Sequence, residues 1–190
     1  TPNRFRNLLT QPAGSTEAWV STRGLHRSGD TLWANSMNGL WRVALSSGQV
    51  SQYAFFRPET RRLDYYQYAH LLDRRGTRWL GSQDLVGLPG PGQPERVIRH
   101  RTKNAWAFFE DGPGTLWLGG EIGLGRVDPR DGRNLGFAGY GPYAELAQAK
   151  ITAFQPDPDG TLWVCASSGL YVLDRRRQRV TARYHVGGDA

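Results

Sequence analysis

One phrase of the sequence occurs four times. It reads RSGDTLWANSMNGLWRVAL at 27–45, DRRGTRWLGSQDLVGLPG at 73–90, DGPGTLWLGGEIGLGRVD at 111–128 and DPDGTLWVCASSGLYVLD at 157–174. The tryptophans at its centre are spaced by 46, 38 and 46 residues, and they are Trp33, Trp79, Trp117 and Trp163. A repeat of about 40–50 residues indicates small supersecondary units that bury their apolar faces only by stacking on one another. The chain is therefore expected to fold as an array of similar modules.

Each repeat is expected to contain four short strands. The first precedes the phrase, at 17–21, 65–72, 104–109 and 150–154. The second contains the tryptophan, at 31–35, 77–81, 115–119 and 161–165. The third opens at Gly-Leu, at 39–45, 123–128 and 169–174, and the fourth lies at 49–55, 95–100, 133–138 and 178–185. Such units predict an all-β fold, a β-propeller built of four-stranded antiparallel blades, with about four blades present.

The second repeat departs from this pattern, because GLPGPGQP at 87–94 replaces its third strand. Proline cannot donate a ladder hydrogen bond, so this blade edge is expected to be short or irregular. The first repeat departs as well, with Arg27 in place of the leading Asp and Asp30 in place of the Gly.

The Asp-x-x-Gly segment of each phrase is expected to form a tight turn, since Asp caps turns and Gly accepts a positive φ. A role in turns also explains why carboxylates recur in the repeats, although paired carboxylates could suggest Ca²⁺ ligands. These residues include Asp73, Asp111, Asp157 and Asp159. The Leu and Trp of the second strand face opposite sides of the sheet. The large flat Trp is expected to fill the space between neighbouring blades.

Composition narrows the possible partners and cofactors. The formal charge is +7, carried almost wholly by scattered arginines, with Lys103 and Lys150 the only lysines, so no nucleic-acid binding is expected. A single cysteine, Cys165, cannot form an internal disulfide, and it is expected to be a small buried strand residue. The four histidines, His26, His70, His100 and His185, show no metal-ligand spacing. We expect no metal and no cofactor.

No stretch reaches the ~18 apolar residues of a membrane helix, and no signal peptide is present. Membrane attachment is therefore expected only through segments outside this chain.

The phrase Gly-Thr-Leu-Trp, with Gly-Leu six and seven residues after the Trp and Asp before and after, resembles the two-component regulator propeller repeat. The resemblance implies the extracytoplasmic sensor domain of hybrid two-component and related bacterial signalling receptors, hence a periplasmic or extracytoplasmic location. It also implies a seven-bladed ring, of which this chain is a part. Two alternatives stay open, namely closure as four blades and association of two chains.

On this reading residues 1–190 form a single, partial propeller domain. Its blades lie approximately at 11–56, 63–101, 103–138 and 149–186, and residues 1–10 supply an N-terminal closing strand. Further blades of a larger receptor, or self-association, would cover its exposed sheet edges.

Function is expected on the face of the blades that carries the non-repeating loops, the top face, because variable loops on a rigid scaffold are where binding is found. Aromatic rings beside Arg and carboxylate groups suit a carbohydrate or another small polar ligand. The candidate ligand-binding residues are Arg57, Arg61, Tyr65, Asp84, Glu121, Tyr140, Tyr143 and Glu145. His70, in a first strand, is a candidate for the central channel.

The main hypothesis is thus a non-enzymatic, ligand-sensing propeller. A first alternative is an enzyme, because EIGLGRV at 121–127 resembles a segment of streptogramin-lyase-like propellers. Such an enzyme needs a top-face histidine and an acidic cluster with bound metal, and only His100 lies near a top loop. A second alternative is a protein-interaction scaffold.

Overall fold

The computed structural model describes residues 22–36, 39–53, 55–57, 62–64, 68–90, 93–137, 143–176 and 179–185. It consists of two compact units, Thr1–Tyr68 and Ala69–Ala190, which are described separately. The closing strand predicted at 1–10 lies outside the described residues. Within the described part, no helix is long and apolar enough to cross a membrane.

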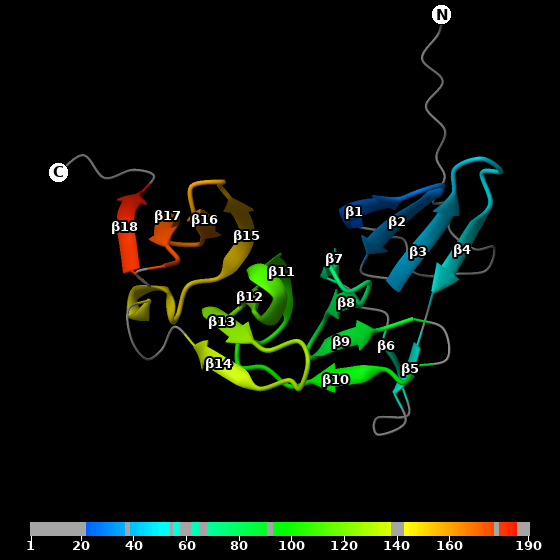
Figure 1. Cartoon of the computed structure of the whole chain (residues 1–190), viewed down its shortest axis with the longest axis horizontal. Coiled ribbons are helices and arrows are strands. Elements are labelled where there is room, and N and C mark those ends of the chain that lie inside the picture. Colours follow the sequence, from blue (N-terminus) through cyan, green and yellow to red (C-terminus); the bar gives the residue numbers. More distant parts are fainter. Residues whose placement is uncertain are drawn as a thin grey trace, which may run out of the picture. The chain divides into compact units, whose positions relative to one another are not determined.

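The first unit contains one four-stranded antiparallel sheet in the order β1-β2-β3-β4 (Figure 1). Its strands are β1 (Thr22–Ser28), β2 (Thr31–Ser36), β3 (Gly39–Ala44) and β4 (Val50–Tyr53). A separate hairpin follows, formed by β5 (Phe55–Arg57) and β6 (Arg62–Asp64).

The first strand of this blade was predicted at the wrong place. The apolar stretch at 17–21, which lies outside the described residues, was chosen for its hydrophobicity. The strand that pairs with β2 is instead the polar stretch Thr22–Ser28. Here the turn is shorter than in the other repeats: Ser28 pairs with Thr31 across Gly29, whose φ is +57°. Strand β1 therefore runs into the repeated phrase and ends at Ser28.

The second unit contains three four-stranded antiparallel sheets, which we number blades 2, 3 and 4 after the first-unit sheet, blade 1. Blade 2 consists of β7 (Ala69–Leu72), β8 (Arg78–Gly81), β9 (Leu85–Leu88) and β10 (Arg96–Ile98). Blade 3 consists of β11 (Ala105–Glu110), β12 (Leu116–Gly120), β13 (Leu124–Val127) and β14 (Asn134–Phe137). Blade 4 consists of β15 (Ile151–Pro156), β16 (Thr161–Ala166), β17 (Gly169–Asp174) and β18 (Arg179–Tyr184).

Two short 3-10 helices lie between these strands, η1 (Gly112–Gly114) and η2 (Ala144–Leu146). The expectation of four-stranded antiparallel blades is confirmed, although the first strand of blade 1 and the third strand of blade 2 differ from the prediction.

Blade 2 does have a third strand, which corrects the prediction that GLPGPGQP replaces it. Strand β9 begins two residues earlier than Gly87, because Leu85 and Val86 pair with Gly81 and Leu80. Gly87 lies opposite Trp79, and a Cβ on Gly87 would come within 2.6 Å of the indole ring. The glycine therefore lets the Trp79 ring lie across β9. The outer strand β10 has only three residues, in line with the expected short edge.

Alternation along the second strand of each blade builds the core. In blade 3, Leu116 and Leu118 face blade 2 and lie in one apolar cluster with Trp79. Trp117 faces the other way, into a cluster with Leu162 and Val164 of blade 4. Trp79 and Trp117 are 0% and 1% exposed. The prediction that the tryptophans fill the space between blades is confirmed for these two.

The Asp-x-x-Gly turns, at 73–77, 111–115 and 157–161, define the bottom face of the second unit. In each turn the leading aspartate accepts a hydrogen bond from the indole Nε1 of the tryptophan six residues later. The distances are 2.8 Å for Asp73–Trp79, 3.2 Å for Asp111–Trp117 and 2.8 Å for Asp157–Trp163. The carboxylates also cap backbone N–H groups, as Asp73 does for Arg75 and Thr77. Their structural interpretation is confirmed, with the indole bond as an additional cause.

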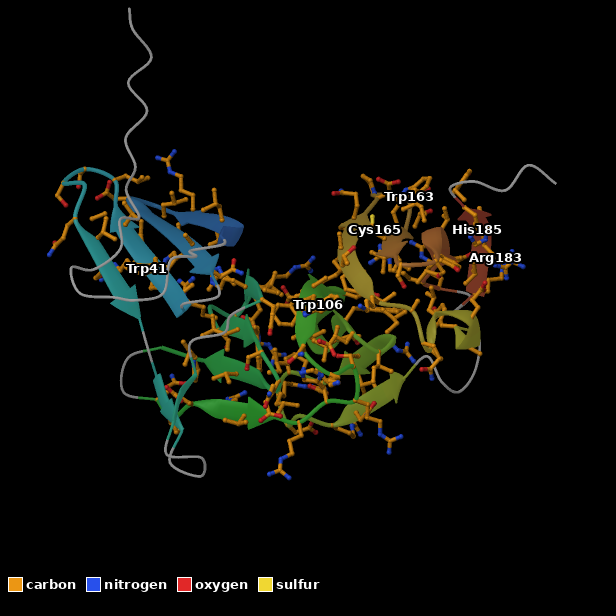
Figure 2. All side chains as sticks on the ribbon, turned by 180° about the vertical axis from the view of Figure 1, so that it is seen from behind. Trp41, Trp106, Trp163, Cys165, Arg183 and His185 are labelled. Carbon is orange, nitrogen blue, oxygen red and sulfur yellow. The ribbon has the colours of Figure 1, made fainter. Side chains whose placement is uncertain are left out.

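The outer side of blade 4 differs from its inner side. Trp163 is only partly buried, and it stacks on Tyr184 with ring centroids 6.0 Å apart. Cys165, two residues further along β16, is exposed and not buried as predicted. Both residues lie on the face of β16 opposite Leu162 and Val164, and no described blade of the second unit covers that face (Figure 2).

Candidate functional site

The top face of the second unit, opposite the aspartate turns, is organised around the connection from β10 to β11, residues 99–104. Three backbone hydrogen bonds tie the end of this connection to the second-to-third-strand loops of two blades. On the blade 2 side, Ala105 N donates to Ser82 O at 2.9 Å. On the blade 3 side, Glu121 N donates to Lys103 O at 2.9 Å and Ile122 N to Thr102 O at 2.8 Å. The loops that carry Asp84 and Glu121 are thus attached to one segment.

The end of this connection has an unusual backbone. Lys103 and Asn104 have φ values of +49° and +54°, and they are the only non-glycine residues at positive φ in the described part of the chain. Such residues are uncommon, and two in succession indicate a locally strained backbone held by its surroundings.

Gly120 makes this conformation possible. A Cβ at Gly120 would lie 2.4, 2.6 and 2.7 Å from the carbonyl oxygens of Thr102, Asn104 and Lys103. Only a residue without a side chain lets the three carbonyl groups approach so closely.

The strained segment places two side chains on Glu121. Asn104 Nδ2 donates to Glu121 Oε1 at 2.8 Å, and Lys103 Nζ lies 3.3 Å from Glu121 Oε2. The side chains of Glu121 and Lys103 are 30% and 65% exposed, so the pair is accessible to solvent. Hydrogen bonds from Asn104 and Lys103 lower the pKa of Glu121, which is a carboxylate at neutral pH.

The second lysine of the chain lies in the segment that is bonded to the Glu121 loop. Gly123 N, in the Glu121 loop, donates to Ala149 O at 2.9 Å, which brings the start of blade 4 alongside. Lys150 is exposed, and its positive charge also contributes to the lowered pKa of Glu121. Ser167 N donates to Lys150 O at 2.8 Å, and Lys150 N donates to Ser167 Oγ at 3.0 Å. We call Lys103, Asn104, Glu121 and Lys150 the Glu121 cluster.

One polar atom of the Glu121 cluster lacks a hydrogen bond. Since the Glu121 carboxylate only accepts, the Asn104 amide must turn its nitrogen towards it. The amide oxygen Oδ1 is then left buried, and it accepts no hydrogen bond from any residue that the structure describes. A buried acceptor without a donor is costly.

A histidine lies at the other end of the same connection. His100 Nδ1 is 2.8 Å from Thr102 Oγ1, and Thr102 is buried. Burial lowers the pKa of His100, while the charge of Asp84 and the carbonyl group of Ser82 act in the opposite direction. His100 is therefore neutral at neutral pH and shares one hydrogen bond with the Thr102 hydroxyl.

Among the other candidates, Tyr143 and Glu145 lie beside η2. Tyr143 is 5% exposed and packs edge-on against Trp117, with centroids 5.7 Å apart. Burial raises its pKa, and its ring belongs to the core between blades 3 and 4. Glu145 is paired with Arg183 of β18, whose Nη2 lies 2.9 Å from Oε1 (Figure 2).

The remaining candidates cannot be placed in the site. Arg57 belongs to β5, in the first unit, and Arg61, Tyr65 and Tyr140 lie outside the described residues. Of the eight predicted residues, the structure therefore brings Asp84 and Glu121 to the two sides of one connection. The role of all eight in ligand binding stays a prediction.

Sequence reasoning did not select Lys103, Asn104 or Lys150. A signal was present, because the only two lysines of an arginine-rich chain both occur within two residues before a first strand. The positive φ of Asn104 carries no such signal in the sequence. In the described part of the chain, no three His, Cys, Asp or Glu residues gather in a way that could hold a metal ion.

Comparison with known proteins identifies the fold. No protein-family model matches the sequence, and no curated protein does. Among solved structures, the chain is similar to the extracellular domain of BT4673 from B. thetaiotaomicron, a protein provisionally assigned to a one component system with one structure and to a hybrid two component system with the other. That match has a TM-score of 0.69 and 21% identity over 95% of this chain, and it covers 24% of the BT4673 chain.

Two further matches are more distant. PorZ of Porphyromonas gingivalis, a surface component of the type-IX secretion system, gives a TM-score of 0.62 with 14% identity over 93% of this chain and 30% of its own. The WD40 domain of Neurospora crassa Pan2 gives 0.61 with 13% identity, over 87% and 50%.

These likenesses confirm the predicted fold class, a β-propeller built of four-stranded blades. The resemblance to sensor propellers is confirmed at the level of the fold. The chain spans about a quarter of the length of BT4673.

Proposed function

We propose that this chain is part of an extracytoplasmic, ligand-sensing and non-enzymatic propeller of a bacterial membrane signalling receptor. The observation that supports it is the similarity of its blades to the extracellular domain of BT4673, together with a top face whose loops do not repeat. In this proposal a carbohydrate or another small polar ligand binds the top face, or a site between two receptor subunits. Binding changes how the two receptor chains pack, and other domains of the receptor deliver the signal.

The test uses the intact receptor in its host membrane, with a transcriptional reporter of its output. A panel of neutral and acidic oligosaccharides is applied from outside. We expect at least one to change the reporter, and the same one to raise the melting temperature of the purified extracytoplasmic region. A full-length gene without membrane-spanning and output segments would refute the receptor assignment.

A lyase stays the second candidate, because His100 lies in the connection that is attached to the loop carrying Asp84. A propeller lyase needs a bound metal, so metal analysis of the purified protein and an elimination assay separate it from the sensor. Turnover that is abolished by a chelator would favour the lyase.

We propose further that additional propeller blades continue the array beyond blade 4. Trp79 and Trp117 are each covered by the second strand of the next blade, whereas Trp163 and Tyr184 remain partly or largely exposed. Cys165 lies on the same face, so the reactivity of its thiol shows whether a further blade covers that face. Its thiol should react with a maleimide in the 190-residue chain and be protected in the full-length protein; equal reactivity in both would contradict the proposal.

A further inference from the structure

We propose that the uncovered side of blade 4 receives a propeller blade whose first strand begins with glycine. Cross-strand pairing places the side chains of this side on one surface, which we call the Trp163 face: Gln155, Trp163, Cys165, Leu170, Val172 and Tyr184. The inference rests on the further blades of the proposed function, and it specifies the blade that docks on blade 4.

The apolar part of the Trp163 face fits a blade. In blade 3 the equivalent Trp117 is covered by Leu162 and Val164 of the second strand that follows, and it is 1% exposed. Trp163 is only partly buried, and Tyr184, which stacks on it, is 55% exposed (Figure 2). The aromatic surface that blade 4 covers on blade 3 is thus repeated on blade 4 itself.

The polar part of the junction is repeated as well. In blade 3 one oxygen of Asp111 accepts the indole hydrogen bond, and the other accepts from Arg175 of the following blade at 2.6 Å. In blade 4 Asp157 Oδ2 accepts from the Trp163 indole at 2.8 Å, and Oδ1 accepts no hydrogen bond from any residue that the structure describes. An aromatic surface beside an available carboxylate oxygen matches the way in which blade 3 receives blade 4.

One residue of the Trp163 face departs from this pattern. The position two residues after the tryptophan is Gly81 in blade 2, Gly119 in blade 3 and Cys165 in blade 4. Each glycine lies against the first residue of the next blade's first strand. A Cβ at Gly81 would lie 2.3 Å from Ala105 O, and a Cβ at Gly119 would lie 2.4 Å from Ile151 Cγ2. A blade that docked unchanged in either way would therefore collide with the Cys165 side chain.

Only one of the two junctions can accept a cysteine after a single change. The obstacle at Gly81 is a backbone carbonyl group, which every residue has. At Gly119 the two closest atoms are Cγ2 and Cβ of Ile151, at 2.4 and 2.8 Å, and the Ile151 carbonyl oxygen is 3.2 Å away. Glycine in place of Ile151 removes both side-chain atoms, and a shift of a few tenths of an ångström relieves the remaining contact. The partner of the Trp163 face is therefore a blade that docks like blade 4 and begins with glycine.

The sequence of the full-length protein is the first test. Ala105 and Ile151 each lie twelve residues before the tryptophan of their own blade. Glycine is expected at the same place in the repeat that follows blade 4. A residue with a side chain at that place would overturn the inference.

The second test compares Cys165→Leu and Cys165→Gly in the full-length protein by amide hydrogen exchange of β16, Thr161–Ala166. Leucine overfills the space opposite the glycine and should speed exchange at least about tenfold; glycine leaves that space empty and should speed it about three- to tenfold. In the 190-residue chain, where Cys165 is exposed, Cys165→Leu should change exchange less than about twofold. Slower exchange in full-length Cys165→Gly would show that the thiol is a steric obstacle, and would overturn the inference.

The junction between blades 3 and 4 provides a matched control in the 190-residue chain. Gly119→Cys and Ile151→Gly should each lower the melting temperature. The double variant should lose less than the sum of the two losses, because the glycine makes room for the cysteine. Additive losses would overturn the inference.

The proposed further blades have a separate readout. If Cys165 reacts equally with maleimide in the full-length protein and in the 190-residue chain, no blade covers the Trp163 face, and both proposals fail. If the thiol is protected but the double variant shows additive losses, the further blades stand and only the glycine is wrong.

Discussion

The bottom and top faces of the second unit are built from the same strands and differ in what repeats. On the bottom face, blades 2, 3 and 4 each use an aspartate to accept the indole hydrogen bond of their own tryptophan. On the top face, the equivalent loops contain Asp84, Glu121 or Ser167, and each makes different contacts. The comparison shows that the recurring carboxylates of the repeat stabilise the blades. Ligand contacts are therefore expected among residues that have no equivalent in the other blades.

The largest expected effect tests the scaffold side of this comparison. Trp117→Ala removes a fully buried side chain between blades 3 and 4, so we expect a loss of about 3–5 kcal/mol in the free energy of unfolding. Trp163→Ala, at the partly exposed position in blade 4, should lose less than half as much in this 190-residue chain. Urea denaturation monitored by circular dichroism measures both, and equal losses would contradict the assignment of an uncovered face to blade 4.

The second-largest effect is expected at Asp111, one of the three bottom-face aspartates that accept an indole hydrogen bond. Asp111→Ala leaves the Trp117 indole N–H and the Arg175 guanidinium without their acceptor, for an expected loss of about 1–3 kcal/mol. Asp159→Ala, at the exposed third position of the blade 4 turn, removes one backbone cap and should cost about 0.5–1 kcal/mol. The two variants are compared by the same denaturation experiment. A loss from Asp159→Ala as large as that from Asp111→Ala would show that turn capping, and not the indole bond, is the main contribution.

The third effect concerns Gly120, where a substitution tests how tightly the top-face connection is packed. Gly120→Ala pushes a methyl group against three carbonyl oxygens of the connection at 102–104, so we expect a loss of about 1–3 kcal/mol and a displaced Glu121 cluster. Gly114→Ala meets only Arg130 Nη2, at 3.8 Å, and should stay within about 0.5 kcal/mol of wild type. Amide chemical shifts of residues 102–104 report the displacement, and an unshifted spectrum would show that the connection is less constrained than the structure indicates.

The smallest expected effect is a pH dependence from His100. Its pKa in the folded protein lies below the usual 6.5, because burial disfavours the charged form. As the pH falls through 6.5 the unfolded chain takes up a proton that the folded chain does not, so the stability decreases. The lowered pKa values of Glu121, Asp128 and Asp159 act at more acidic pH, since the usual values are 4.5, 3.8 and 3.8.

The decrease just below pH 6.5 should therefore vanish in His100→Gln. Melting temperatures between pH 7.5 and 5.5 measure it, and an identical pH profile for wild type and variant would rule out His100 as its source.

The sequence predicted the scaffold well because one phrase is repeated. The positions of β2, β3 and all four outer strands follow from the tryptophan spacing and the Gly-Leu pair. Strand β1 was misplaced because hydrophobicity at 17–21 outweighed the repeat, which aligns the polar stretch Thr22–Ser28 with β11. The prediction that Cys165 is buried was wrong, because burial depends on which blade lies next to its face of the strand.

The candidate site was only partly predictable. Asp84 and Glu121 could be chosen, because they stand in loops that follow a predictable strand. The Glu121 cluster could not, since Lys103 and Lys150 are 47 residues apart in the sequence, and their segments are bonded to the Glu121 loop only in the folded chain. Tyr143 could be chosen from the sequence, but its burial could not be predicted. It was expected to face a ligand, and its ring instead packs on Trp117 in the core.

The carboxylate of Asp111 contacts two successive modules at once. One oxygen holds Trp117 of its own blade, and the other lies 2.6 Å from Nη1 of Arg175, whose guanidinium also stacks 5.0 Å from the Phe109 ring. An arginine of blade 4 thus pairs with a carboxylate of blade 3. Loss of blade 4 would therefore weaken blade 3 at the bottom face as well as uncover Trp117, in line with the nearest-neighbour coupling of repeat proteins.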